Sequence, residues 1–189
     1  MKTQLVLPFS EFNLNESQFD HPSRLHGVLH TYRVMAHVLR LGELTGRITE
    51  ARNAFFAAYI HDMARKHDGY CTQHGTDAAN LKLPLYKSLF QQNGASLNDL
   101  FIIGKATTMH SLGNELPAND PDWYTVAILK DADALDRIRL GENDLNPSYL
   151  RLSETHTFVD FAKQLYYKSV SQPGKDFISI MEIGKSLQD

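Results

Sequence analysis

The chain has 189 residues, of which 42% are hydrophobic and 22% are charged. This composition is typical of a folded globular protein with a sizeable core, and it excludes extensive disorder. The formal net charge is -3 at pH 7, with no basic tail. A general nucleic-acid-binding surface is therefore not expected, although a local basic pocket is compatible with this charge.

The sequence is typical of a cytoplasmic protein. No apolar stretch approaches the ~20 residues needed to span a bilayer, so we expect no membrane association. Residues 1–20 form an N-terminal segment with a short apolar run and no signal-peptide cleavage site. The single cysteine, Cys71, has no partner for an internal disulfide, which agrees with a reducing compartment.

The main domain is expected over residues 21–170. Its first helix is predicted from about Pro22 to Leu44, where apolar residues recur every three to five positions. Ser23 is the expected N-cap. Gly46 follows the end of the helix, where left-handed backbone is favoured.

The second helix is predicted from Thr49, its expected N-cap, to Arg65. It is apolar around most of its circumference, as a central buried helix should be. A third long helix is predicted over residues 123–140. Shorter helices are expected near residues 76–81, 96–109 and 155–169. Because convincing period-two alternation is absent, the sequence predicts one all-α bundle, with residues 171–189 as a tail or an appended helix.

Several of the nine histidines lie where a metal ion would be useful. His61 and Asp62 end the most buried predicted helix, and burying an unpaired carboxylate is costly, which favours a divalent cation beside it. Alternatively, Asp62 caps the helix next to a surface histidine. His26 and His30 are four residues apart and so share one helix face.

The third long helix carries Asp131, Asp133 and Asp136 among apolar residues. Carboxylates on such a helix are unusual unless they meet a cation. In chain order, the motifs are His-Thr-Tyr-Arg-Val, then His-Asp, then Lys-Asp-Ala-Asp-Ala-Leu-Asp-Arg.

These ordered motifs resemble the H…HD…D signature of the HD-domain superfamily of metal-dependent phosphohydrolases. The resemblance covers about residues 25–140 and implies a helical bundle around a buried metal site. It also implies four metal ligands, namely His30, His61, Asp62 and Asp133. Asp131 is the alternative to Asp133, which we prefer because Ala-Asp-Ala-Leu is closer to the family's segment.

Two further histidines extend the resemblance to two-metal members, such as diadenosine-tetraphosphate hydrolases and cyclic-dinucleotide phosphodiesterases. His74 and His110 match the order of their additional ligands. The alternatives are a solvated loop residue for His74 and, for His110, a helix-end residue that binds the last carbonyls. His26 is expected beside the ligands or at the surface.

Three cations near these motifs are candidates for binding a substrate phosphate, namely Arg33, Arg65 and Lys66. Salt bridges to Asp68 or Asp136 are the alternative for each of them. One-metal relatives often have glutamate at the place of Arg65, as a group that orients water. Its absence favours a two-metal mechanism.

The resemblance implies a hydrolase that uses a metal-activated water to cleave a phosphate ester or anhydride. A small phosphorylated substrate, such as a nucleotide or a dinucleotide, is expected. Imidazole and carboxylate ligands suit one or two ions of Fe, Mn, Zn, Co or Ni. Two alternatives stay open, a di-iron oxygenase on the same scaffold and a non-catalytic nucleotide-binding protein.

Overall fold

The protein is all-helical in a computed structural model that describes residues 5–172 and 176–187. No strand occurs within these two ranges, which confirms the predicted fold class. The helices are α1 (Val28–Thr45), α2 (Ile48–Ile60), α3 (His74–Asp77), α4 (Leu83–Gln92), α5 (Leu97–His110), α6 (Trp123–Leu135), α7 (Ser153–His156), α8 (Val159–Ser171) and α9 (Phe177–Lys185). Among the described helices, none has the length and apolarity needed to cross a membrane.

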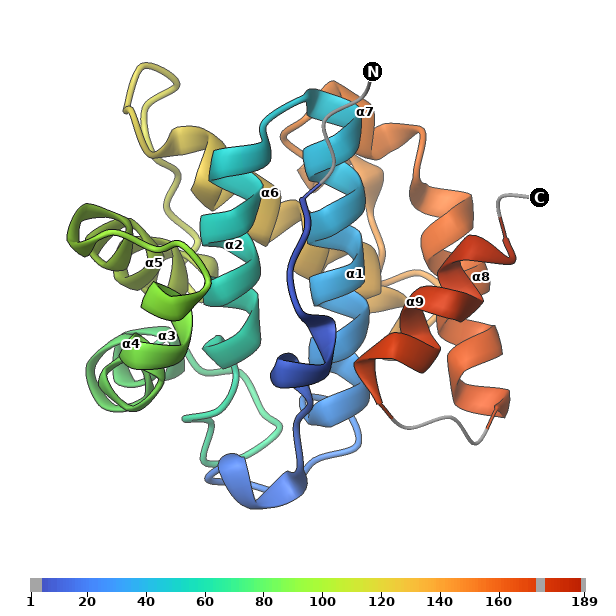
Figure 1. Ribbon diagram of the computed structural model, residues 1–189. Coiled ribbons are helices and arrows are strands. Elements are labelled where there is room, and N and C mark those ends of the chain that lie inside the picture. The colour runs from blue at the N-terminus through green and yellow to red at the C-terminus, as the bar shows by residue number, and fades with distance from the viewer. Residues whose placement is uncertain (1–4, 173–175, 188–189) are drawn as a thin grey trace.

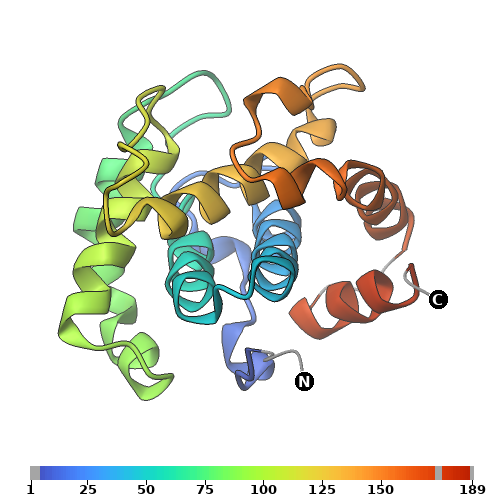
Figure 2. The same cartoon turned by 90° about the horizontal axis from the view of Figure 1, so that it is seen from above.

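Helices α1 and α2 form the centre of the molecule, and α6 crosses both of them (Figures 1 and 2). Helices α3, α4 and α5 lie on the α2 side, and α8 and α9 lie on the α1 side. Helix α2 is buried on nearly all sides because alanines and aromatic residues cover its circumference. The start of α1, the end of α2 and the end of α6 therefore meet at one end of the core.

The first helix is shorter than predicted, because α1 begins at Val28 rather than near Pro22. Ser23 does not cap it. Its hydroxyl accepts hydrogen bonds from the amides of Leu25 and His26, at 3.0 and 2.8 Å, and so holds a turn before the helix. Gly27 allows this turn to close, since a Cβ there would lie 2.1 Å from the Ser23 carbonyl oxygen. The turn brings His26 to the start of α1.

The predicted C-cap of α1 is confirmed, because Gly46 has a left-handed φ of 69°. The prediction for the start of α2 is wrong: Arg47, not Thr49, is the N-cap, and its side chain accepts no capping hydrogen bond from the helix. Helix α2 ends at Ile60, and residues 61–64 form a turn. His61 and Asp62 thus lie in the turn that directly follows α2.

The third long helix also ends early, at Leu135, and continues as the 3-10 turn η4 (Asp136–Arg139). Because a 3-10 turn is wound more tightly than an α-helix, the side chains of η4 point in directions that a helix to residue 140 would not give. Helix α4, which follows the π-helical turn η3 (Ala78–Lys82), has no counterpart among the predicted helices. The shorter helices predicted near 96–109 and 155–169 correspond to α5 and to α7 with α8.

Both ends of the described chain pack on the central helices. Phe12, in the 3-10 turn η1 (Phe9–Phe12), is fully buried, with its ring centroid 5.1 Å from that of Phe55. Phe177 of α9 is also fully buried, against Tyr32 and Phe55. Helix α9 lies in the segment expected as a tail or an appended helix, of which residues 173–175 and 188–189 are outside the described ranges.

Candidate metal centre

Four histidine rings converge where α1, α2, α3 and α5 approach one another. Nε2 of His30, near the start of α1, lies 3.1 Å from Nε2 of His61, which follows α2. Nε2 of His74, the first residue of α3, lies 3.0 Å from Nε2 of His110, the last residue of α5. The rings of His61 and His110 join these two pairs, with centroids 5.0 Å apart.

The opposite nitrogen of each ring, Nδ1, faces a hydrogen-bond acceptor 2.5–3.0 Å away. The acceptors are Asp136 for His30, and the carbonyl oxygens of Ala58, Cys71 and Thr107 for His61, His74 and His110, respectively. An acceptor at Nδ1 requires the proton there, so a neutral ring keeps a lone pair on Nε2. The lone pairs of His30, His61 and His110 then point to the centre, as in metal-binding histidines held by a second hydrogen bond. The ring of His74 also contacts Arg65, whose Nη1 lies 3.1 Å from each of its nitrogens.

Asp62 lies between the two histidine pairs. Its Oδ2 is 3.4 Å from Nε2 of His30 and 3.5 Å from that of His61. Its Oδ1 is 3.1 Å from Nε2 of His74 and 3.7 Å from that of His110. Burial alone would raise the pKa of this carboxyl group, but the surrounding imidazoles lower it well below its usual range. Asp62 therefore adds a buried negative charge to the centre.

Asp133, on α6, closes the group on the side of His30. Its Oδ1 lies 3.4 Å from Nε2 of His30, is buried, and has no hydrogen-bond partner among the described residues. Burial raises the pKa of this carboxyl group, but the guanidinium of Arg139 and the nearby imidazoles lower it to about 2. Burial also lowers the pKa of His61 to about 3, so that ring is neutral. Both carboxylates of the centre are thus ionised at neutral pH.

This donor set fits a metal ion. Two ligands about 2.1 Å from one ion lie roughly 3.0–3.4 Å apart in ordinary coordination geometries, close to the 3.0–3.7 Å between the neighbouring ring nitrogens and carboxylate oxygens here. Oδ1 of Asp133 has no hydrogen-bond donor among the described residues, and its counter-charge there is the guanidinium of Arg139, 3.6 Å away. A metal ion would give this buried oxygen a direct partner. These His/Asp groups can hold a metal ion, and all six predicted ligands lie within them or beside them.

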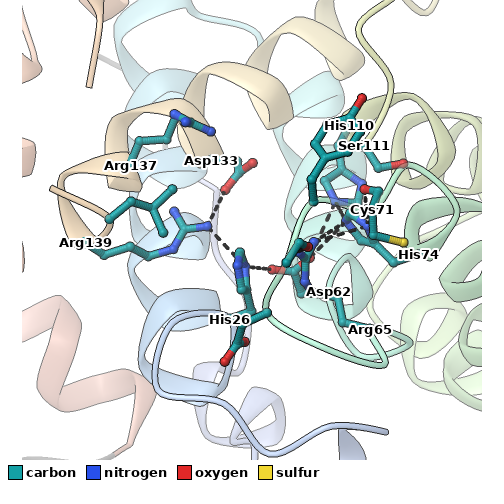
Figure 3. A pocket seen from close by; sticks show the side chains of 14 residues that line it. His26, Asp62, Arg65, Cys71, His74, His110, Ser111, Asp133, Arg137 and Arg139 are labelled. Carbon is teal, nitrogen blue, oxygen red and sulfur yellow. Dashed lines mark hydrogen bonds and ion pairs between the residues drawn. The ribbon is translucent and has the colours of Figure 1, made fainter. Parts of the chain in front are cut away.

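His26 lies closer to the centre than a surface position would place it. Its Nδ1 is 3.0 Å from Oδ2 of Asp62 and 3.3 Å from Nη2 of Arg139. Burial lowers the pKa of His26, although Asp62 opposes this shift. Figure 3 shows His26 between Arg139 and Asp62 on the wall of the cavity.

Asp131, the alternative to Asp133, points away from the centre. Its carboxylate accepts hydrogen bonds from the amides of Arg151 and Leu152, at 3.0 and 2.9 Å, and from the hydroxyl of Thr155 at 2.8 Å. Asp131 thus fixes the chain before α8 to α6, and the structure brings only Asp133 of these two to the histidines.

Two of the three predicted phosphate-binding cations lie away from the cavity. Arg33 is buried behind His30, where its Nε and Nη2 donate to Asp136 at 2.6 and 3.0 Å. Lys66 is exposed and pairs with Asp20. For both, the salt-bridge alternative describes the structure, with Asp136 as predicted for Arg33 and with Asp20 in place of Asp68 for Lys66.

Three arginines line a cavity beside the candidate metal centre. The volume of this cavity is about 320 Å³. Arg65 was predicted, and its Nη1 lies 3.6 Å from Oδ1 of Asp62. Arg137 and Arg139, in η4, were not predicted as site residues; they line the opposite wall together with Asp133 (Figure 3). Arg137 follows Asp133 by four positions, a spacing that places both on one helix face and could have indicated it. Arg139 is the last residue of the 3-10 turn η4.

Nη1 of Arg139 has no hydrogen-bond partner among the described residues, and the same holds for Nε of Arg65. Both side chains are nevertheless nearly buried. The cavity therefore has carboxylates and imidazoles on one side and guanidinium donors on two walls. This arrangement is suited to binding a metal ion and an anionic ligand together.

No family model matches the chain, and comparisons with curated proteins and with solved structures give no match either. A function for this chain is therefore inferred from the geometry of the site.

Proposed function

We propose that this protein is a metal-dependent phosphohydrolase of the HD-domain type, which cleaves a phosphate ester or anhydride. One observation carries the proposal: four imidazole rings and two carboxylates converge beside a cavity whose walls carry Arg65, Arg137 and Arg139. Metal ligands alone would fit many chemistries. Guanidinium groups beside them favour a phosphate, which they bind through paired hydrogen bonds.

The ligand types favour Fe, Mn, Zn, Co or Ni. Such an ion supplies Lewis acidity, which lowers the pKa of water towards ~7 and makes hydroxide available at neutral pH. The chain's own residues have separate tasks. Asp62 stays ionised, His61 stays neutral, and Arg65 and Arg139 hold the non-bridging phosphate oxygens so that the phosphorus faces the floor of the cavity.

We further propose that the centre binds two ions and that Asp62 bridges them. Its Oδ2 faces His30 and His61, while its Oδ1 faces His74 and His110. Each oxygen thus has its own histidine pair. Arg65 also occupies the sequence position at which one-metal HD hydrolases often have a water-orienting glutamate, which favours two ions.

The test is phosphate release by metal-free protein to which Mn, Co, Ni, Fe, Zn or Mg is added singly. The panel should contain nucleotides, dinucleotides and simple phosphate esters. Activity with at least one transition metal, its loss in Asp62→Asn and its retention in Asp160→Asn, a change on the exposed face of α8, are the expected results. A metal-replete protein that is inert towards the whole panel would contradict the proposal, and an iron electron paramagnetic resonance signal that changes with O₂ would then favour an oxygenase.

A further inference from the structure

A second cavity, of about 710 Å³, adjoins the cavity of the metal centre. We call them the outer and the inner cavity. Their walls share four residues, namely Tyr70, His110, Asp133 and Arg137. A ligand whose phosphate lies in the inner cavity therefore extends into the outer one. The walls of the outer cavity thus determine which organic group the substrate carries.

Two exposed tyrosines line the outer cavity. Tyr70 is 91% exposed and Tyr149 is 71% exposed. Large aromatic side chains with so much free surface beside a binding cavity are suited to stacking on a planar group. The carbonyl of Tyr149 accepts a hydrogen bond from Nη1 of Arg151 at 3.0 Å, and the same nitrogen lies 3.1 Å from Asp131 on α6. The backbone of Tyr149 is therefore fixed to a rigid helix before a ligand arrives.

The cations in the deeper wall of the outer cavity are already neutralised. Nζ of Lys130 donates to the carboxylate of Glu115 and to the carbonyls of Leu112 and Asn114, at 2.8–3.0 Å. Arg151 donates from Nε and Nη2 to the same Glu115 carboxylate, at 2.9 and 2.6 Å. A second phosphate would have to break this network. In the inner cavity, by contrast, Nε of Arg65 and Nη1 of Arg139 have no hydrogen-bond partner among the described residues.

The rim of the outer cavity adds neutral and acidic groups. Asn143 and Asn146 offer amides, and Asp144 is half exposed beside Arg137. Amides pair with the edges of heterocyclic bases, which carry both donors and acceptors. An exposed carboxylate repels a further phosphate. The outer cavity is therefore suited to a neutral, planar, hydrogen-bonding group.

We infer that the substrate is a nucleoside monophosphate, with its single phosphate in the inner cavity and its base stacked on Tyr149 and Tyr70. This inference rests on the proposed phosphohydrolase function, and it ranks mononucleotides above dinucleotides with several phosphates. In the reaction, the oxygen of one water forms a bond to phosphorus and the bond from phosphorus to the nucleoside oxygen breaks. A proton from the water ends on that oxygen, which leaves as the nucleoside hydroxyl.

The experiment compares kcat/KM of the metal-loaded protein for adenosine monophosphate, ribose 5-phosphate and diadenosine tetraphosphate. The variants are Tyr149→Ala, Tyr149→Phe and Tyr70→Ala, with Tyr167→Ala, an exposed tyrosine of α8 outside both cavities, as the matched control. Base stacking on an aromatic ring contributes roughly 5–150-fold in affinity. Tyr149→Ala should therefore raise KM for the mononucleotide by a factor in this range and leave ribose 5-phosphate unchanged, while Tyr149→Phe retains the wild-type KM.

Two results would overturn the inference while the proposed function stands. One is an equal loss on ribose 5-phosphate and on the nucleotide in Tyr149→Ala, and the other is faster turnover of diadenosine tetraphosphate than of the mononucleotide by wild type. Phosphate release from none of the three substrates would instead count against the proposed function, and the inference would fall with it. Far-UV circular dichroism melting of each variant checks that the fold is intact.

Discussion

Oδ2 of Asp136 lies 2.7 Å from Nδ1 of His30, and the guanidinium of Arg33 holds the same carboxylate from the other side. Burial opposes the ionisation of Asp136, but Arg33 and His30 keep its pKa well below the usual range. The carboxylate therefore fixes the proton of His30 on Nδ1 and turns the Nε2 lone pair to the centre. Neither Asp136 nor Arg33 lines the cavity, yet together they fix the orientation of the His30 ring.

The first prediction follows from this arrangement. Asp136→Asn should weaken metal binding by about 10–100-fold, because the amide holds the ring of His30 less firmly and lowers its basicity. Competition with a metal chelator, followed by elemental analysis, measures the change. Asp160→Asn, exposed on α8, is the control. An unchanged metal affinity in Asp136→Asn would mean that His30 does not bind the ion.

Asp62→Ala should remove metal binding and activity together while the protein still folds. In wild type, metal at 100 times its dissociation constant stabilises the folded state by about 2.7 kcal/mol, because it binds only that state. The variant should gain nothing from added metal in a thermal melt. Full metal content and turnover in Asp62→Ala would refute the central assignment.

His74→Ala and His110→Ala should each lower the metal content from two ions towards one and cost most of the activity. Their Nε2 atoms face only one oxygen of Asp62, so the ion bound by His30 and His61 keeps its own ligands. His67→Ala serves as the control, because His67 is exposed outside the cluster. Elemental analysis near one ion per chain in wild type, with both variants fully active, would exclude the second ion.

His37 predicts a loss of stability in acid. Its ring is fully buried against Phe158 and Phe161, with no hydrogen-bond partner among the described residues, and burial lowers its pKa from 6.5 to about 4. Between these values the unfolded chain binds more protons, so the free energy of unfolding falls as the pH decreases through this window. At a pH low enough to protonate His37 in both the folded and the unfolded state, this shift lowers the free energy of unfolding by about 3 kcal/mol.

His37→Leu removes this titration and the two unpaired ring nitrogens. Its free energy of unfolding, from urea titrations of metal-free protein, should exceed that of wild type most at pH 4 and least at pH 7.5. Equal pH dependence in the two proteins would show that other groups account for the acid sensitivity. His156→Leu, an exposed change on α7, is the matched control.

Periodicity in the sequence predicted the central helices, because α1, α2 and α6 bury apolar stripes that the pattern reveals directly. It did not predict α4, in which Phe90 is buried while Leu83, Tyr86 and Leu89 pack on the core from a partly exposed helix. The ends of the helices were also inaccurate. The tight turn around Gly27 depends on a contact with Ser23 that no periodic pattern records.

For the site, residue order indicated the six side chains that the structure brings together, but not the residues that surround them. Asp131 and Asp133 carry the same side chain two positions apart, and only tertiary contacts, with Arg151 and Thr155 in one case and His30 in the other, distinguish them. The same holds for the cations. Arg33 and Arg139 carry the same charge, and the sequence does not distinguish them. In the structure, Arg33 binds Asp136 behind His30, whereas Arg139 lines the cavity.

The centre is assembled from residues that are far apart in the chain: His30 and its supporting carboxylate are 106 positions apart. During synthesis, chains fold from the N-terminus onwards. The histidines of α1 and α2 therefore leave the ribosome long before α6, which brings Asp133 and Asp136. The candidate centre is therefore complete only after α6 has packed across α1 and α2, and its carboxylate from Asp133 depends on the assembly of the core.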